Sequence, residues 1–339
     1  MKKRLLVITP DFSLNGANVV LLELLECLNE KYTITIIASE DGTLYEKFST
    51  KGYKCKLCQS VSKSNIDECD EVFLNASSVH YYALLFQNTD KKVYWWFHES
   101  MAQLNTQRTN FVHLGLLSDN FHFLAAAPMI VRGLKEMYGV QASLLPMVIK
   151  DVSADFNCSE EKIIFMPGAY TYIKGQDVLL SAISRLPLNM INEYQFVFAG
   201  YHLEEQSDYY NKLEKIASRI PNVKLLSNLS REEVYEYYKK AICVVAPSRV
   251  DTSPATIVEA LMFSKLCIVS SGAGISEFMT DCINGFVFQN EDVDELYKRL
   301  LLVMTEYSNL DQVKSAGRKV YEENFSIRSM KDRYLSIFD

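Results

Sequence analysis

RVDTSPATIVEA, residues 249–260, places two carboxylates, Asp251 and Glu259, eight positions apart on either side of a proline. The preceding run, ICVVAP, is short, rich in β-branched residues and closed by a proline, which is typical of a buried strand arriving at its carboxyl end. A helix is expected after a short turn, with Ser253 as its N-cap and Pro254 as its first residue. This prediction places Asp251 in the loop and Glu259 inside the helix.

The start of this predicted helix has the features of an anion site. The amides of Ala255 and Thr256 would lie at the positive end of the helix dipole, where a phosphate group is favoured. A carboxylate in front of that end and another behind it could hold both sides of a phosphate-bearing ligand. The alternative is a capped helix with a solvated acid on its exposed face. The stretch by itself leaves both interpretations open.

Composition limits the class of protein. The 339 residues are too many for one ordinary core and fit two domains. A net charge of −7 and the lack of a basic stripe argue against a nucleic-acid binder. The opening MKKRLLVITPDF contains an apolar run of only LLVI, so it is interpreted as a first strand and not as a signal peptide. We therefore expect a cytoplasmic protein with no integral membrane segment.

Strand-like runs alternate with helical patterns, and the alternation restarts after a polar segment at 150–162. Seven runs precede that segment and six follow it: RLLVITP, YTITIIAS, YKCKLC, EVFLNA, KVYWWFHE, NFHFLAAA and ASLLPMV, then IIFMPG, YQFVFAG, VKLLS, ICVVAP, LCIVSS and GFVFQ. Such βα alternation predicts parallel sheets covered by helices on both faces. The expected fold is α/β, with two tandem Rossmann-like, doubly wound domains that face a central cleft.

Each half of the chain offers a loop suited to phosphate. PDFSLNGANVV carries Gly16 before a helical pattern, and FMPGAYTYIKGQDVLL places Lys174 after a strand. A glycine lets a backbone approach a ligand closely, and an ammonium could neutralise a diphosphate. SSGAGISEF, 270–278, is a third strand–glycine–helix turn. The G-x-G-x-x-G of a dinucleotide site is absent, and a solvated surface lysine is the alternative for Lys174.

No metal site is predicted. Cys55 and Cys58 form a C-x-x-C, but no second pair completes a zinc set. The one D-x-D, Asp292 and Asp294, lies at the start of an amphipathic helical pattern, where acids cap the helix and complement its dipole.

Three segments in order carry a resemblance to a known family. PGAYTYIKGQD, APSRVDTSPATIVEA and SSGAGISEFMTDCINGFVF resemble the carboxyl-terminal domain of retaining GT-B glycosyltransferases of family four, the glycosyl transferases group 1. That family's signature is two acids separated by seven residues, and here Asp251 replaces the usual first glutamate. The match covers most of residues 160–325, whereas the first half matches loosely through the NGA loop and WFHES. The resemblance implies an acceptor-side domain at 1–155, a nucleotide-sugar domain at 156–325, and a terminal helix at 326–339 that returns to the first domain.

The resemblance assigns the donor site position by position. Glu259 is expected to bind the ribose hydroxyls, and Asp251 is expected to contact hydroxyls of the donor sugar. Lys174 and the amides of Ala255 and Thr256 are expected to receive the diphosphate.

His98 matches a histidine that lies beside the reacting sugar, and Gly16 matches a loop near the phosphates. The alternative for His98 is a strand-end histidine bonded to a backbone group. The family usually has an arginine where this chain has Ala169 or Ile173, and Arg249 is the hypothetical substitute because it lies beside the first acid.

The implied activity is transfer of a sugar from a nucleoside-diphosphate sugar to an acceptor hydroxyl, with retention and without a metal or further cofactor. The expected acceptor is a glycan, glycolipid or protein in polysaccharide or glycoconjugate synthesis, and a peripheral contact at the inner face of the membrane is compatible with this. Three alternatives stay open: a non-catalytic GT-B partner of another transferase, a nucleotide-sugar epimerase, and a dinucleotide oxidoreductase.

Overall fold

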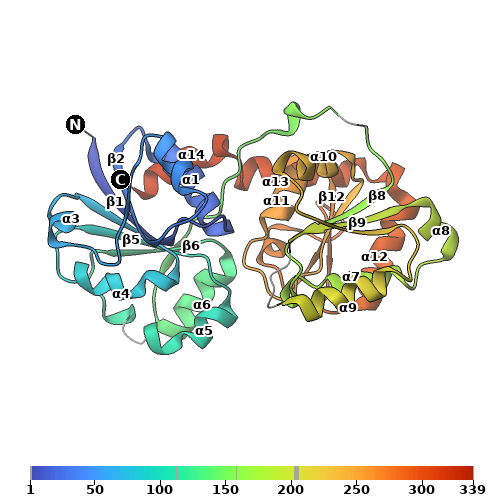
Figure 1. Cartoon of the computed structure of the whole chain (residues 1–339), viewed down its shortest axis with the longest axis horizontal. Helices are drawn as coiled ribbons and strands as arrows, with labels where there is room; N and C mark the ends of the chain where they lie inside the picture. Colours follow the sequence, from blue (N-terminus) through green and yellow to red (C-terminus); the bar gives the residue numbers. More distant parts are fainter. Residues whose placement is uncertain (1, 112–113, 158, 202–205, 339) are drawn as a thin grey trace. The chain divides into compact units, whose positions relative to one another are not determined.

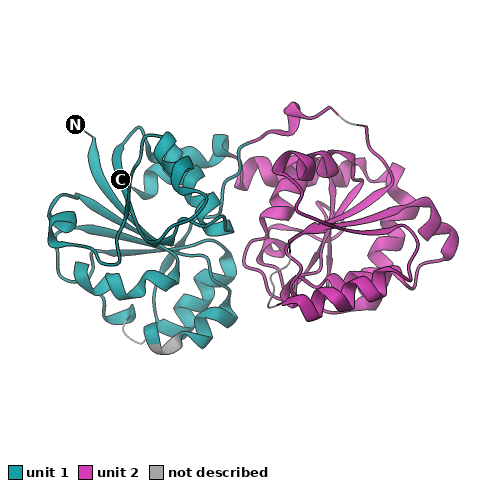
Figure 2. Cartoon of the chain, in the orientation of Figure 1, with its two compact units in different colours: residues 1–150, 327–339 teal, residues 151–326 magenta. Residues whose placement is uncertain are grey.

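The computed structural model describes residues 2–111, 114–157, 159–201 and 206–338 of the chain. These form two compact units, residues 1–150 with 327–339 and residues 151–326, coloured separately in Figure 2. The first division falls five residues before the boundary expected from the sequence, because the polar segment from Asp151 belongs to the second unit.

The first unit is built on a parallel sheet of seven strands in the order β3-β2-β1-β4-β5-β6-β7. The strands are β1 (Lys3–Asp11), β2 (Tyr32–Glu40), β3 (Lys54–Leu57), β4 (Glu71–Asn75), β5 (Lys92–Phe97), β6 (Phe121–Ala125) and β7 (Ala142–Leu144). The helices are α1 (Gly16–Leu28), α2 (Tyr45–Thr50), α3 (Lys63–Asp67), α4 (His80–Ala83), α5 (Met101–Thr106), α6 (Pro128–Tyr138) and α14 (Ile327–Ile337). Figure 1 shows α1 and α14 on one face of this sheet and α4, α5 and α6 on the other.

The second unit has a parallel sheet of six strands in the order β10-β9-β8-β11-β12-β13. The strands are β8 (Ile163–Pro167), β9 (Gln195–Gly200), β10 (Val223–Ser227), β11 (Cys243–Ala246), β12 (Leu266–Ser270) and β13 (Phe286–Phe288). The helices are α7 (Gln176–Ile183), α8 (Leu188–Glu193), α9 (Ser207–Ala217), α10 (Arg231–Lys240), α11 (Ala255–Met262), α12 (Val293–Glu306) and α13 (Asp311–Asn324). Each of the runs expected to be a strand therefore forms one, in both halves of the chain.

The strand order reverses once in each sheet. In the first sheet the chain moves outward from β1 through β2 to β3 and then returns to the other side of β1 with β4. In the second sheet the same reversal separates β8 from β11. The loops that leave the carboxyl ends on the two sides of such a point diverge, and ligands of doubly wound folds bind there.

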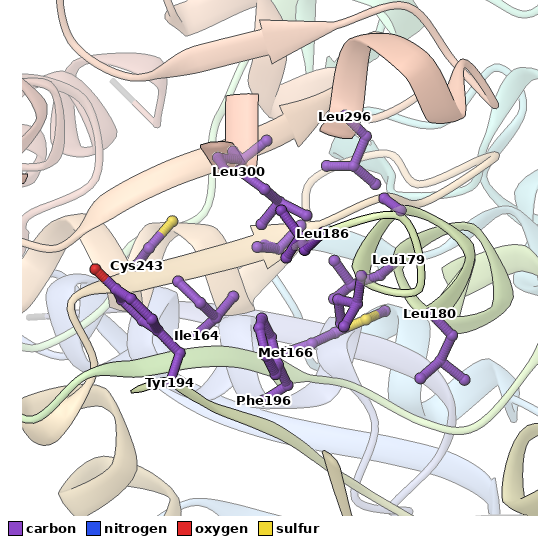
Figure 3. Packing of buried hydrophobic residues seen from close by; sticks show 14 of the residues in the cluster. Ile164, Met166, Leu179, Leu180, Leu186, Tyr194, Phe196, Cys243, Leu296 and Leu300 are labelled. Carbon is purple, nitrogen blue, oxygen red and sulfur yellow. The ribbon is translucent and has the colours of Figure 1, made fainter. Parts of the chain in front are cut away.

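The core of the second unit is a continuous layer of apolar side chains between the sheet and its helices. Figure 3 shows Ile164 and Phe196 of the sheet packed beneath Leu179 of α7 and Leu300 of α12. The buried Tyr194 places its hydroxyl 2.7 Å from the carbonyl oxygen of Met304, so this polar atom is satisfied inside the core. The near-continuous apolar strands reflect a sheet that is covered on both faces.

The last helix, α14, packs in the first unit and not in the second. Phe338, which follows it, is fully buried among the rings of Tyr32, Phe73 and Tyr94. Tyr334 donates a hydrogen bond to the carbonyl oxygen of Pro146. The chain therefore returns to the first unit at its end.

We predict that Phe338→Ala destabilises the first unit by about 3 to 5 kcal/mol, because it removes a large buried ring and leaves a cavity. Both tryptophans of the chain, Trp95 and Trp96, are in β5, so their fluorescence during urea unfolding reports on the first unit alone. The control is Asp332→Ala, an exposed position on the same helix, which we expect to change little. An equal effect of the two variants would show that the aromatic contacts do not hold the chain end.

Candidate functional site

The loops after β8 and β11 lie against each other at the reversal point of the second sheet. The amide of Arg249 donates to the carbonyl oxygen of Ile173 at 2.8 Å. Gly175 has a φ of +74°, and a Cβ atom there would lie 2.2 Å from the carbonyl oxygen of Pro247. Only glycine allows this close approach. The glycine of the lysine loop therefore has a packing reason that is independent of any ligand.

Lys174 and Asp251 form an ion pair across these two loops. Their Nζ and Oδ2 atoms are 2.5 Å apart, and the side chains are 27% and 13% exposed. The loop after β12 holds Asp251 from behind: the amide of Asp251 donates to Gly272, and the amide of Gly274 donates to the Asp251 carbonyl at 2.8 Å. The third glycine turn noted in the sequence thus supports the acid loop through its backbone. Two of the predicted donor-site residues are in direct contact.

Helix α11 begins one residue later than expected. Pro254 has a ψ of 108°, so it occupies the N-cap position, and Ala255 is the first helical residue. The prediction of Ser253 as N-cap is wrong: Pro254, with its extended ψ, occupies that position, and the Ser253 side chain makes no capping bond. The first hydrogen bond of the helix runs from the Ile257 amide to Pro254 at 3.0 Å. The amides of Ala255 and Thr256 precede it, and they are donors that a helix does not satisfy internally.

Glu259 lies one turn into this helix and is 2% exposed. Its carboxylate is paired with the guanidinium of Arg231, which is half-exposed and stacks on the Tyr235 ring 4.6 Å from its centroid. Burial raises the pKa of Glu259, while the charge of Arg231 and a hydrogen bond with Tyr238 oppose that shift. A buried carboxylate needs such partners to stay charged.

Sequence reasoning missed Arg231 as a member of the site. It is the first residue of α10, directly after Ser230, which forms a capping box with Glu233. The position of Arg231 at the amino end of a predicted helix could have indicated it. A cation there interacts unfavourably with the helix dipole, which suggests that another interaction favours the arginine.

Arg249, the hypothetical substitute for the family arginine, has an extensive set of partners within the second unit. It donates two parallel hydrogen bonds to Asp177, at 2.9 and 2.8 Å, and one to Glu291 at 2.6 Å. Its guanidinium also stacks on Tyr172 at 3.8 Å. Burial acts to raise the pKa of Asp177, but the hydrogen bonds from Arg249 keep that pKa below its ordinary value. These contacts give Arg249 the role of a brace between three loops.

Three hydroxyl groups near the carboxyl ends of β8, β10 and β11 are buried without a hydrogen-bond partner among the described residues. They belong to Thr171, Ser227 and Ser253. Buried polar atoms are nearly always paired, so such groups require an explanation, for which an absent ligand is one candidate. Thr171 precedes Lys174 and Ser253 precedes α11, so two of them flank the predicted diphosphate position.

His98 follows β5 at the carboxyl edge of the first sheet. Its Nε2 atom lies 3.0 Å from Oδ1 of Asn75, the last residue of β4, and its ring packs on Trp96 at 4.1 Å. The alternative of a ring bonded to a backbone group is therefore not what the structure has. Burial lowers the pKa of His98 to about 3, so the imidazole is neutral at physiological pH.

Gly16 is the first residue of α1, behind the N-cap Asn15. A Cβ atom added to Gly16 would meet nothing within 4 Å, and no left-handed φ requires a glycine there. Packing of the first unit therefore does not explain this glycine, and the space beside it is open to a ligand.

The D-x-D acids have the predicted structural role. Asp292 caps α12 by accepting from the amide of Glu295 at 2.9 Å, and Asp294 pairs with Arg185. Over the described part of the chain, no three His, Cys, Asp or Glu side chains gather as a metal ion would need. The described helices likewise include none of the length and apolarity required to cross a bilayer.

Two doubly wound units with parallel sheets define the GT-B class of glycosyltransferase folds, and solved structures agree. Anabaena Alr3699/HepE in complex with UDP aligns with 100% of this chain and 99% of its own, at a TM-score of 0.86 and 13% identity. WaaG, a glycosyltransferase involved in lipopolysaccharide biosynthesis, aligns with 98% of this chain and 99% of its own, at a TM-score of 0.72 and 12% identity. At these identities the likeness establishes the fold alone.

The sequence comparisons identify the family. The profile described as "Glycosyl transferases group 1" matches residues 150–320, half of the chain, and the chain belongs to this family. The Campylobacter jejuni GalNAc-alpha-(1->4)-GalNAc-alpha-(1->3)-diNAcBac-PP-undecaprenol alpha-1,4-N-acetyl-D-galactosaminyltransferase is 26% identical over 191 residues, 55% of this chain and 50% of that protein. The uncharacterized glycosyltransferase MJ1178 of Methanocaldococcus jannaschii is 25% identical over 163 residues, 47% of this chain and 42% of that protein. The match spans half or less of these curated relatives.

The neutral, part-buried His98 predicts a measurable pH dependence of stability. In the unfolded chain a histidine takes up a proton near pH 6.5, whereas folded His98 stays neutral down to about pH 3. Because the unfolded state binds more protons between these values, the first unit should lose stability as pH falls, by about 1.4 kcal/mol per pH unit from this residue. His98→Gln should remove that contribution.

The measurement is urea unfolding followed by tryptophan fluorescence at pH 7 and pH 5, for wild type and His98→Gln. The comparison variant is His122→Gln, at an exposed strand position where burial and the charge of Lys92 also lower the imidazole pKa, and it should change the pH dependence less than His98→Gln does. Parallel pH profiles for wild type and His98→Gln would contradict a neutral buried imidazole.

Proposed function

We propose that the chain transfers a sugar from a nucleoside-diphosphate sugar to an acceptor hydroxyl, with retention at the anomeric carbon and without a metal ion. The observation that carries the proposal is the set of groups at the reversal point of the second sheet. The Lys174–Asp251 pair lies on the loops in front of α11, the free amides of Ala255 and Thr256 begin the helix, and Glu259 is one turn behind. Anabaena Alr3699/HepE, which has the same fold, was solved with UDP and with UDP-glucose.

In the proposed mechanism, Lys174 exchanges its partner when the donor binds. The ammonium moves from Asp251 to the diphosphate, which also receives the amides of Ala255 and Thr256. Negative charge grows on the leaving diphosphate as the sugar–phosphate bond breaks, so donors aimed there stabilise the transition state more than the ground state. The released Asp251 carboxylate is then available to accept hydrogen bonds from hydroxyls of the donor sugar.

Glu259 is proposed to bind the ribose hydroxyls. Burial favours its neutral form, and the charge of Arg231 opposes this and favours the carboxylate. A charged carboxylate accepts hydrogen bonds from two neighbouring hydroxyls more strongly than a neutral acid does. Arg231 therefore supports ribose binding by keeping Glu259 ionised.

The family arginine missing at Ala169 and Ile173 needs a replacement. Arg249 could reach a diphosphate only by giving up Asp177 and Glu291, so its contacts favour a bracing role. The unpartnered hydroxyls of Thr171 and Ser253 are better placed to take part, because they are free to donate at no cost in existing bonds. An Arg249→Ala variant with unchanged donor affinity would remove Arg249 from the donor site.

The proposed acceptor is a glycan, glycolipid or protein, and the proposed setting is polysaccharide or glycoconjugate synthesis in the cytoplasm at the inner face of the membrane. This rests on the activity of the Campylobacter jejuni relative, whose name describes transfer to an undecaprenol-linked saccharide. The ion pair and the second acid favour a transferase over a non-catalytic partner or an epimerase.

We predict that one of the UDP, GDP, dTDP or ADP sugars binds the wild type, and that Glu259→Gln weakens that binding about 10- to 100-fold. Loss of hydrogen bonds to a charged group costs about 1.5 to 3 kcal/mol, which gives this range. Titration calorimetry measures it, with Glu214→Gln on the exposed side of α9 as the control that should bind like wild type. No binding by any of these sugars to the folded protein would favour the non-catalytic alternative.

Ser253→Ala should have opposite effects on stability and on donor binding. Removing an unpaired buried hydroxyl should stabilise the free protein by about 1 kcal/mol, whereas a lost contact to the diphosphate should weaken donor binding severalfold. Hydrogen exchange of peptides from the second unit reports the stability, and calorimetry reports the affinity. Ser184→Ala, whose hydroxyl already bonds to Ser181, is the control for both. A Ser253→Ala variant that binds the donor like wild type would exclude this hydroxyl from the site.

A further inference from the structure

We propose that Asn75 is a positioning residue that holds the single proton of the His98 ring on Nε2, so that Nδ1 is an acceptor for a hydroxyl of the substrate. This rests on the proposed function in one respect, since it takes His98 to be the histidine beside the reacting sugar. The tautomer itself is a property of the free protein and is tested without any substrate.

The assignment starts at two backbone carbonyl groups that can only accept. Nδ2 of Asn18 lies 3.1 Å from the carbonyl oxygen of Asp11 and 3.0 Å from that of Ser13, and 2.9 Å from the Asp11 carboxylate. An atom surrounded by acceptors must be the amide nitrogen, so the orientation of the Asn18 side chain is fixed. Its Oδ1 atom is consequently an acceptor that faces the other way.

The orientation of Asn18 in turn fixes the orientation of the Asn75 side-chain amide. Oδ1 of Asn18 accepts from the Thr9 hydroxyl at 2.9 Å and lies 3.4 Å from Nδ2 of Asn75, which also donates to the Thr9 oxygen at 3.1 Å. The opposite orientation of Asn75 would bring two amide oxygens to 3.4 Å and leave Thr9 with one proton for two acceptors. Asn75 therefore presents its Oδ1 atom to His98.

The orientation of Asn75 determines which nitrogen of the His98 ring carries the proton. Oδ1 of Asn75 is 3.0 Å from Nε2 of His98, and an amide oxygen only accepts, so Nε2 carries the hydrogen. A neutral imidazole has one N–H, and burial keeps this ring neutral. Nδ1 is therefore unprotonated. It can accept a hydrogen bond from a hydroxyl, but it cannot donate one to a phosphate oxygen.

Among the residues that the structure describes, the two carboxylates nearest this network have other partners than the ring. The Glu99 carboxylate is engaged by the backbone amides of His98 and Ser77, at 3.0 and 2.5 Å. The Asp11 carboxylate is engaged by Ser13 and Asn18 at the far end of the chain of hydrogen bonds. The ring itself packs on Trp96, which is apolar.

Burial strengthens this network of hydrogen bonds and favours one orientation of each side chain in it. Thr9, Asn18 and Asn75 are each 1% exposed or less, and hydrogen bonds are stronger in such surroundings than in water. Thr9 and Asn75 lie near the carboxyl ends of β1 and β4, at the reversal point of the first sheet. Asn18 lies in the first turn of α1. The network thus joins the helix end that carries Gly16 to the strand end that carries His98. The reversal of strand order thus brings together the side chains that determine the tautomer of the His98 ring.

The test is heteronuclear NMR of protein labelled with ¹⁵N-histidine, with His98 assigned by the signal lost in His98→Gln. We expect the wild-type His98 ring to be the Nε2–H tautomer and not to titrate between pH 8 and pH 5. In Asn75→Asp the carboxylate should still accept from Nε2 but should stabilise the imidazolium, so His98 should begin to titrate in that range. In Asn75→Leu, of similar volume, the acceptor is gone and the two tautomers should become mixed.

Asn29→Asp, at the exposed end of α1, is the control and should leave the His98 spectrum unchanged. A wild-type Nδ1–H or mixed tautomer would overturn the proposal, and so would an unchanged tautomer in Asn75→Leu. If Asn75→Leu does not fold, the wild type and Asn75→Asp still decide, because an Asp variant whose ring stays untitrated would contradict direct contact.

Turnover assays separate this proposal from the proposed function. If a donor is found, Asn75→Asp should move the acid limb of the kcat/KM profile to higher pH, because the ring is then protonated and loses its acceptor. If no donor is turned over, the transferase proposal fails while the NMR result still decides the tautomer.

Discussion

In both units the strand order of a parallel sheet reverses beside its first strand, and the candidate groups depend on this constraint. Loops that leave neighbouring strands normally cross to the same face, but at the reversal they go to opposite faces and leave their carboxyl ends uncovered. In the second unit this point lies between β8 and β11, whose loops carry Lys174 and Asp251. In the first unit it lies between β1 and β4, whose ends carry Thr9 and Asn75. Polar side chains, whose burial elsewhere in such apolar sheets would cost free energy, are gathered at these two places.

Two ion pairs hold four charged groups of the candidate site in the second unit. Asp251 neutralises Lys174, and Arg231 neutralises Glu259. Removing a charge from water without a partner costs several kcal/mol, so the pairs keep a half-buried site compatible with folding. In the proposed mechanism the ligand displaces Asp251 from Lys174, so it must offer the lysine an anionic group at least as favourable as that carboxylate, whereas Arg231 stays paired with Glu259. The proposed nucleoside-diphosphate sugar has anionic oxygens for Lys174, ribose hydroxyls for Glu259 and sugar hydroxyls for Asp251.

The sequence was sufficient to predict the strands, the two-unit organisation and the gathering of the Lys174 and Asp251 loops at one edge of the second sheet. These features follow from short apolar runs between turns, which are determined locally. It was not sufficient for features that depend on neighbours distant in the chain. Ser253 was taken for a cap, since the sequence does not reveal that the ψ of Pro254 is extended. Arg231 was missed because its partner Glu259 is far along the chain. Asn75 was missed because an asparagine at the end of an apolar strand has no pattern that links it to His98.

Hydrogen–deuterium exchange of the intact protein, with and without UDP, GDP, dTDP or ADP at saturating concentration, tests the proposed donor site. We expect one nucleotide to slow exchange in peptides covering residues 168–175 and 251–262, because the amides at the start of α11 become hydrogen-bonded to the diphosphate. Slowing confined to another part of the second unit would contradict it, for example at the basic pocket lined by Lys265, Lys314 and Arg318. So would the absence of any change in the two predicted segments with all four nucleotides.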